Sequence, residues 1–292
     1  MFVSSLTPFS ENLEVDHEIL EENIKDIINE GVHGIIAAGI NGEFSSLTIN
    51  ERKAVFETII NVAGDKVTVI TAAYANSLKN AKELIKHSKE IGASAAIITT
   101  PFFFRRPSDE GLFGYFEKIF EFEKKLPILL CNVPIYSLIP IKHSIIEKLH
   151  EKYKNLVGIK DMSGKPESIT AYAGVFNDLS VLIGSDRLLF HGLNIGCDGA
   201  VTAIGSVLPK YVLNIYSIYQ SGDIDKAWIE QEKLSGIRSI LKRFPSRAGL
   251  KYIYEQLSGR RSYVRPPLRN LTSIEKESLE AILYEHGLLQ QE

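Results

Sequence analysis

Hydrophobic and polar positions along the chain follow two patterns that alternate. Short runs rich in apolar and β-branched residues recur eight times, and longer stretches with a helical period lie between them. Runs this apolar are typical of strands that are buried on both faces, as in a parallel sheet covered by helices. The expected strands are Phe2–Leu6, Gly34–Ala38, Val67–Ala72, Ala95–Thr100, Ile128–Asn132, Leu156–Lys160, Val181–Gly184 and Gly199–Thr202.

Eight strand–helix units within the first 206 residues favour a closed (β/α)8 barrel, the TIM-barrel fold, over an open doubly wound sheet. The glycine-rich turn of a dinucleotide site is also missing after the first strand, which weakens the open-sheet alternative. The amphipathic segments between strands predict helices over His17–Asn29, Asn50–Val62, Leu78–Ile91, Glu110–Phe122 and Ile145–Lys152.

After the eighth strand the chain continues as helices only. We therefore expect residues 1–206 to form the barrel core, and residues 207–292 to supply the last barrel helix and a C-terminal helical extension of the same domain. The stretch Val264-Arg265-Pro266-Pro267 separates the last two helices, because proline interrupts helical hydrogen bonding. The expected helices of this tail are Lys210–Gln220, Ile224–Leu241, Arg247–Leu257 and Ile274–His286.

Composition narrows the class of protein. Of the 292 residues 45% are hydrophobic, enough for a sizeable core, and 33 basic against 36 acidic residues give a formal net charge of −3. Without a basic run, nucleic acid and membrane surfaces are not expected as partners. Cys131 and Cys197 make no disulfide framework and have no metal-ligand spacing. With no secretory signal and no apolar run of membrane-spanning length, we expect a soluble protein of the cytoplasm.

Lys160 closes an apolar strand at its carboxyl end, where parallel barrels carry their chemistry. With a two-residue period it shares a face with Gly158 and Leu156, whereas Ile159 points the other way. If that face is inward, Gly158 leaves space for the long side chain. A desolvated lysine has a lowered pKa, and its neutral amine can attack a ketone to form a Schiff base. The alternative is a lysine that leans into solvent and pairs with Asp161.

The turn Gly39–Glu43 is a second candidate site. Its glycines allow backbone N–H groups around Asn41 and Gly42 to converge on a carboxylate near the start of a helix. An ordinary strand-to-helix turn is the alternative interpretation.

Further polar groups stand at the ends of other strands. Gly184, Ser185 and Asp186 could hydrogen-bond substrate hydroxyls; alternatively Ser185 or Asp186 caps the Arg187–Asn194 helix. The remaining candidates for substrate binding at strand ends are Cys131, Asn132 and Thr202.

Taken together, these positions resemble the dihydrodipicolinate synthase / N-acetylneuraminate lyase family of class I aldolases. Each motif alone is weak, but their order and spacing over some two hundred residues are specific. The motifs are Thr7-Pro8-Phe9, Gly39–Glu43, Leu47-Thr48, Glu51-Arg52, Asn76-Ser77, Thr100-Pro101, Pro107-Ser108, Glu110-Gly111-Leu112, Asn132-Val133-Pro134, Gly158–Asp161, Gly184–Asp186 and Gly196 through Ser206.

The resemblance implies a (β/α)8 barrel, usually a homotetramer, in which the lysine matching Lys160 forms an imine with pyruvate or another 2-keto acid. The imine makes an enamine at the third carbon accessible, and that enamine adds to an aldehyde or forms when a carbon–carbon bond breaks. The protonated imine is the electron sink, so no metal and no other cofactor is expected.

Three departures concern proton transfer. The family usually carries hydroxyl groups where this chain has Ile40, Phe103 and Cys131, and in the family those hydroxyls relay protons. Tyr74, where the family commonly has glycine, is our candidate replacement; the alternative is an aromatic ring that only fills space. Asn41 replaces a threonine and can still donate to the keto acid's carboxylate beside the Gly42 N–H.

The expected substrate is 2-keto-3-deoxygluconate, cleaved to pyruvate and glyceraldehyde. Dihydrodipicolinate synthases carry an arginine where this chain has Tyr136, and the aromatic run ending at Arg106 has the length found in archaeal-type 2-keto-3-deoxygluconate aldolases. Arg106 matches a phosphate-binding arginine of relatives, but Val133 replaces their tyrosine, so we expect a preference for the non-phosphorylated sugar acid. Dihydrodipicolinate synthase or N-acetylneuraminate lyase activity, or a barrel that binds a 2-keto acid or sugar acid without turnover, remain the alternatives.

Overall fold

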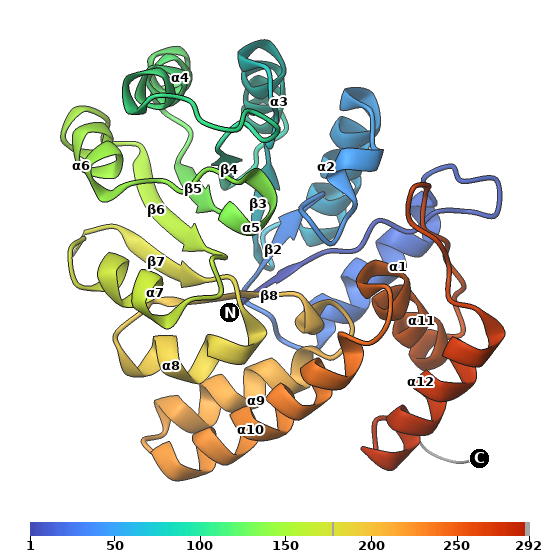
Figure 1. Cartoon of the computed structure of the whole chain (residues 1–292). Helices are drawn as coiled ribbons and strands as arrows, with labels where there is room; N and C mark the ends of the chain where they lie inside the picture. Colours follow the sequence, from blue (N-terminus) through green and yellow to red (C-terminus); the bar gives the residue numbers. More distant parts are fainter. Residues whose placement is uncertain (177, 290–292) are drawn as a thin grey trace.

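A computed structural model describes residues 1–176 and 178–289 of the chain. Eight parallel strands form a closed barrel in the order β1 to β8, and β8 pairs with β1 to complete it (Figure 1). The fold predicted from the alternation of strands and helices is therefore confirmed. The strands are β1 Phe2–Ser4, β2 Gly34–Ala37, β3 Thr68–Ala72, β4 Ala95–Thr99, β5 Ile128–Asn132, β6 Leu156–Asp161, β7 Ser180–Ile183 and β8 Gly199–Thr202.

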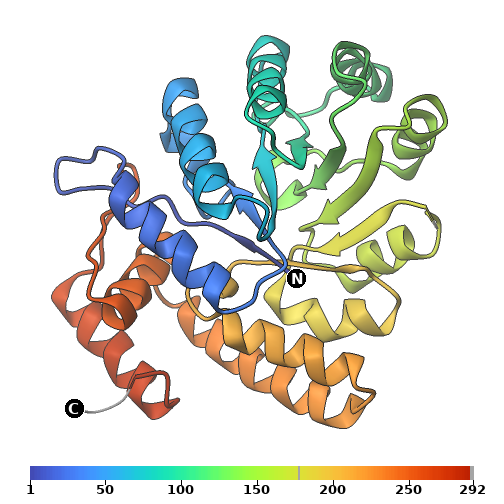
Figure 2. The ribbon, with the colours of Figure 1, turned by 180° about the vertical axis from the view of Figure 1, so that it is seen from behind.

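Helices surround the barrel in chain order (Figures 1 and 2). The predicted helices begin and end within two residues of the observed ones, but α5 and α7 had no sequence signal that we recognised, and the expected helix from Arg187 is a 3-10 turn followed by α8. No described helix is long and apolar enough to cross a bilayer. The helices are α1 His17–Asn29, α2 Ile49–Ala63, α3 Leu78–Glu90, α4 Asp109–Phe122, α5 Pro134–Ser137, α6 His143–Lys152, α7 Pro166–Ala173, α8 Leu189–Asn194, α9 Pro209–Gln220, α10 Ile224–Leu241, α11 Ser246–Ser258 and α12 Ser273–Glu285.

Buried apolar side chains form two clusters, one between barrel and helices and one inside the barrel. The inner cluster includes Leu129, Cys131 and Leu182. A bulge between β5 and β6 breaks the strict alternation predicted for β6, so that Leu156 joins the outer cluster instead of sharing the inner face with Lys160. From Gly158 onward the register is regular, and it places Lys160 between Cys131 and Leu182.

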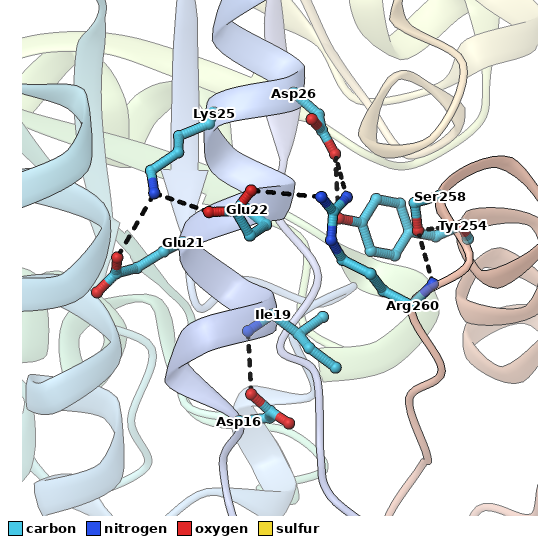
Figure 3. Close-up of polar contacts among 9 residues, drawn as sticks. All are labelled: Asp16, Ile19, Glu21, Glu22, Lys25, Asp26, Tyr254, Ser258 and Arg260. Atoms are coloured by element: carbon cyan, nitrogen blue, oxygen red, sulfur yellow. Dashed lines mark hydrogen bonds and ion pairs between the residues drawn. The ribbon is translucent and has the colours of Figure 1, made fainter.

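In the C-terminal extension, α10 packs on α9, and α11 lies beside α1 (Figures 1 and 2). Arg260, just after α11, donates to Asp26 at 3.2 Å and to Glu22 at 3.3 Å, both on α1 (Figure 3). The Tyr254 hydroxyl donates to the same Asp26 carboxylate at 3.2 Å. These contacts fasten the carboxyl end of α11 to the barrel, and its amino end lies at the site described next.

Candidate active site

The Lys160 side chain points into the barrel and is only 3% exposed. Burial lowers the pKa of its ammonium, an effect partly opposed by the nearby Cys131 and Asp186. A Cβ on Gly184 would lie 3.1 Å from Lys160 Cε, whereas one on Gly158 would meet Ser180 and Leu129, so the glycine that makes room for the lysine is Gly184 and not Gly158 as predicted. The alternative of a solvent-facing lysine is wrong.

Asp161 does not pair with Lys160 either. Its carboxylate accepts hydrogen bonds from Asn132 Nδ2 at 2.6 Å, Ser163 Oγ at 2.6 Å and Ser168 Oγ at 3.2 Å. Asn132 Oδ1 in turn accepts from the Ile141 N–H at 3.0 Å. Asn132 was predicted to bind substrate, but its amide is occupied by Asp161 and the Ile141 N–H and so links the ends of β5 and β6.

The turn between β2 and α2 stands at the same end of the barrel as Lys160. Asn41 is 8% exposed, and its amide hydrogen-bonds to no other group of the described chain. Gly42 packs so closely that a Cβ there would lie 2.9 Å from Thr7 Oγ1. That hydroxyl is buried without a partner in the described residues. The predicted Asn41–Gly42 pair thus remains available to a carboxylate, and Thr7 adds a hydroxyl that sequence reasoning did not single out for this role.

Tyr74 follows β3 and is fully buried beside Cys131. The two groups are close enough to affect each other's pKa, although the phenol makes no hydrogen bond of ordinary geometry. Burial raises the pKa of Tyr74, so the phenol keeps its proton. Arg52 donates from Nη1 to the Tyr74 carbonyl at 2.7 Å and from Nη2 to the Ala72 carbonyl, which fixes the end of β3.

The other two substituted relay positions offer no replacement. Ile40 presents an alkyl group at the cavity wall, and Phe103 is 88% exposed with a φ of 80°. Tyr74 is therefore our candidate among these positions, because its phenol is buried beside Cys131.

A Tyr74→Phe variant tests this role. If the phenol moves a proton, the variant should lose about 10²–10⁴-fold in kcat, while pyruvate still forms its imine on Lys160. Steady-state kinetics and borohydride trapping separate the two steps. Unchanged turnover would leave Tyr74 as a ring that fills space, as the alternative has it.

Asp186 is engaged in structural contacts. Its carboxylate is 2.8 Å from Arg238 Nε on α10, and it accepts from the N–H groups of Ala203 at 2.8 Å and Ile204 at 3.3 Å. The predicted capping of its own helix is wrong, because the groups that it caps follow β8. Both carboxylate oxygens are engaged by protein groups, Oδ1 by the Ala203 N–H and Oδ2 by the Ile204 N–H and Arg238, which favours a structural role over the predicted contact with substrate.

The remaining predicted residues lie at the mouth or in its wall. Gly184 and Ser185 are half-buried there, and Thr202 is buried and donates to the Phe2 carbonyl at 3.4 Å. Arg106 is exposed and does not line the cavity beside the barrel mouth. In the described residues we find no cluster of three His, Cys, Asp or Glu side chains that could hold a metal ion.

That cavity has a volume of about 260 Å³ and is lined by Ile40, Tyr74, Thr99 and Val133 among others. Arg247 of α11 also lines it, with its guanidinium 5.7 Å from the centre of the Tyr136 ring and Nε 3.5 Å from the Ile40 carbonyl. Sequence reasoning missed Arg247, because it lies more than a hundred residues from Tyr136 and only the fold brings them together.

A barrel with a desolvated lysine at the carboxyl end of β6 is the arrangement of a Schiff-base lyase, and comparison with known proteins agrees. The chain belongs to the Dihydrodipicolinate synthetase family, whose pattern it matches over residues 1–286. It is a carbon–carbon lyase of the class I, pyruvate-dependent aldolase type.

Individual relatives are similar over nearly the whole chain. The 4-hydroxy-tetrahydrodipicolinate synthases of Methanopyrus kandleri and Bartonella bacilliformis are 32% and 31% identical, over 97% and 98% of this chain and 95% and 97% of their own. The crystal structure of YagE, a prophage protein from E. coli K12 in complex with pyruvate, superposes with a TM-score of 0.93 at 26% identity, covering 99% of this chain and 98% of that one. These relatives are named as dihydrodipicolinate synthases or family members, so they do not show the expected closeness to 2-keto-3-deoxygluconate aldolases.

Proposed function

We propose that the protein cleaves 2-keto-3-deoxygluconate reversibly to pyruvate and glyceraldehyde through an imine on Lys160. The observation that carries this proposal is the buried Lys160 amine at the mouth of the barrel, with its pKa lowered by desolvation. Asn41, the Gly42 N–H and the Thr7 hydroxyl, which has no partner among the described residues, would hold the keto acid's carboxylate.

The reaction follows from this arrangement. The neutral Lys160 amine attacks the C2 carbonyl, and loss of water gives a protonated imine. When the C3–C4 bond breaks, its electron pair moves toward the imine nitrogen to form an enamine, and the C4 hydroxyl loses its proton to become the aldehyde. The enamine then takes a proton at C3, and water releases pyruvate and the free amine. Tyr74 is our candidate for these proton transfers.

Two residues of the cavity wall bear on the choice of substrate: Tyr136 on the reaction with aspartate semialdehyde, and Val133 on the binding of a phosphate. Tyr136 stands where dihydrodipicolinate synthases carry an arginine, and it is more than half exposed beside the cavity. Val133 is buried in the wall and offers no donor to a phosphate. We therefore propose that the non-phosphorylated sugar acid is preferred over its 6-phosphate.

Reduction with borohydride in the presence of pyruvate tests the proposal. The expected result is an adduct of pyruvate mass on Lys160, followed by turnover when an aldehyde is supplied. Glyceraldehyde, glyceraldehyde 3-phosphate, aspartate semialdehyde and N-acetylmannosamine should be compared side by side, and glyceraldehyde should give the highest kcat/KM. Trapping without turnover of any aldehyde would instead indicate a barrel that binds keto acids, and no trapping would overturn the proposal.

Condensation of pyruvate with aspartate semialdehyde is the second candidate, favoured by Arg247. The Arg247 guanidinium, on α11, lies beside Tyr136, the position where dihydrodipicolinate synthases carry an arginine. A guanidinium there can hold a carboxylate through two hydrogen bonds. The names of the curated relatives favour the same reaction. A higher kcat/KM with aspartate semialdehyde in the same comparison would establish it.

We also propose that the chain works as a homotetramer in the cytoplasm. Large apolar side chains are exposed after β4 and β5: Phe103 and Phe104 on the loop before α4, and Ile135, Tyr136 and Leu138 on α5 and at its end. Exposed apolar patches commonly mark association surfaces. Sedimentation equilibrium would measure the number of chains directly.

A further inference from the structure

Glu43 ends the turn that carries Asn41 and Gly42, and it is buried. Its side chain is 1% exposed, and its backbone has a φ of 53°, a left-handed conformation that residues with a Cβ seldom adopt. Both carboxylate oxygens accept hydrogen bonds from the C-terminal extension: Oε1 from Lys251 Nζ at 2.6 Å, and Oε2 from the Arg265 N–H at 3.2 Å. The end of the turn is thus attached to a distant part of the chain.

Lys251 of α11 is as deeply buried as its partner. Its ammonium also donates to the Tyr263 carbonyl at 2.6 Å and lies 4.2 Å from the centre of the Phe9 ring. Burial lowers the pKa of Lys251 to about 8, although Glu43 opposes the effect. A buried charge stays stable only with such partners, so removal of either member of the pair leaves the other in an unfavourable environment.

Arg247 lies four residues before Lys251, one helical turn away and on the same face of α11. It reaches the Ile40 carbonyl at the start of the same turn. One face of α11 therefore contacts the turn on both sides of Asn41 and Gly42, through Ile40 and through Glu43.

We propose that Lys251, acting through Glu43, positions the Asn41–Gly42 turn so that it binds the carboxylate of the keto acid. The inference rests on the proposed function, because it assigns the turn to that carboxylate. Lys251 is a positioning residue: it contacts Glu43 and not the substrate. Donors that bind a carboxylate must be held within a fraction of an ångström, and the Lys251–Glu43 pair fixes a turn whose backbone is otherwise unfavourable.

The test measures pyruvate binding apart from later steps. The pyruvate concentration that gives half-maximal borohydride trapping on Lys160 is determined for the wild type, for Lys251→Met, and for the double variant Lys251→Met/Glu43→Gln. Lys251→Met should unfold at a lower temperature, since it leaves Glu43 buried without its cation. The double variant removes both charges and should recover most of that loss, yet its half-maximal pyruvate concentration should stay raised about tenfold or more.

Arg260→Met provides the matched control. It removes the Arg260 bonds to Asp26 and Glu22 that help to hold the other end of α11 against α1, and it does not touch the turn, so it should lower the melting temperature and leave pyruvate trapping unchanged. The inference is overturned if the double variant traps pyruvate like the wild type, or if Arg260→Met weakens trapping equally. A wild type that traps no pyruvate overturns the proposed function, and with it this assignment of the turn.

Discussion

Replacement of Lys160 by methionine should abolish pyruvate trapping and lower turnover by about 10⁴-fold or more, because the other buried lysine of the described residues, Lys251, lies on α11 and is paired with Glu43. Methionine keeps most of the apolar stem and removes a charge that is costly to bury. The fold should therefore persist, which circular dichroism can verify. Lys142→Met, at an exposed lysine paired with Asp109, is the matched control and should trap pyruvate normally.

Lys160→Met also tests how the free energy of unfolding depends on pH, because a desolvated lysine has a lowered pKa. Because the pKa of Lys160 is lowered, its amine is neutral at pH values where a free lysine is still charged, and trapping should decline only as pH falls through that lowered pKa. Between the folded and unfolded pKa values the unfolded chain binds more protons, so this group makes stability rise with pH in that window. Lys160→Met should remove that contribution, which urea unfolding at several pH values would detect. An identical slope in the variant would contradict a desolvated lysine.

Asp186→Ala should lower the free energy of unfolding by about 3–5 kcal/mol, because it leaves the Arg238 guanidinium without its partner in a largely buried site. It also leaves the N–H groups of Ala203 and Ile204 without their acceptor. Urea unfolding provides the measurement. A loss confined to kcat/KM, with normal stability, would return Asp186 to the substrate-binding role predicted from the sequence.

Asp223→Ala is the control for this prediction. Asp223 is an exposed aspartate that accepts from the Lys226 N–H at 3.1 Å and so caps α10. Loss of a helix cap lowers stability by only about 1 kcal/mol. The difference between the two variants isolates the buried ion pair from the general effect of losing an aspartate.

The fold could be predicted because its strands are buried on both faces and its helices on one. The contrast appears in the local pattern of apolar and polar residues, and this pattern predicted the ends of all eight strands to within two residues. What failed was detail that depends on packing. The bulge between Leu156 and Gly158 could not be predicted because it depends on the pairing with β5, and the short helices α5 and α7 have too few turns for a clear period.

Some residues of the candidate site could likewise be predicted from the sequence, and others could not. Lys160 and Asn41 could be found because each ends or follows a strand, and strand ends meet at one edge of a parallel barrel. Asn132 and Asp186 stand at equivalent positions, yet their bonds to Asp161 and Arg238 cannot be read from position alone. Arg247 and Lys251 come from a helix that follows the barrel, and only its docking on the β2–α2 turn gives them a place in the site.

The bond between Glu43 and Lys251 joins residues 208 positions apart. During synthesis, all eight strands of the barrel are made before the lysine that neutralises this carboxylate is added. If Lys251 positions the Asn41–Gly42 turn as proposed, a barrel closed before α11 has docked would bind the keto acid weakly, and full activity would require the last part of the chain.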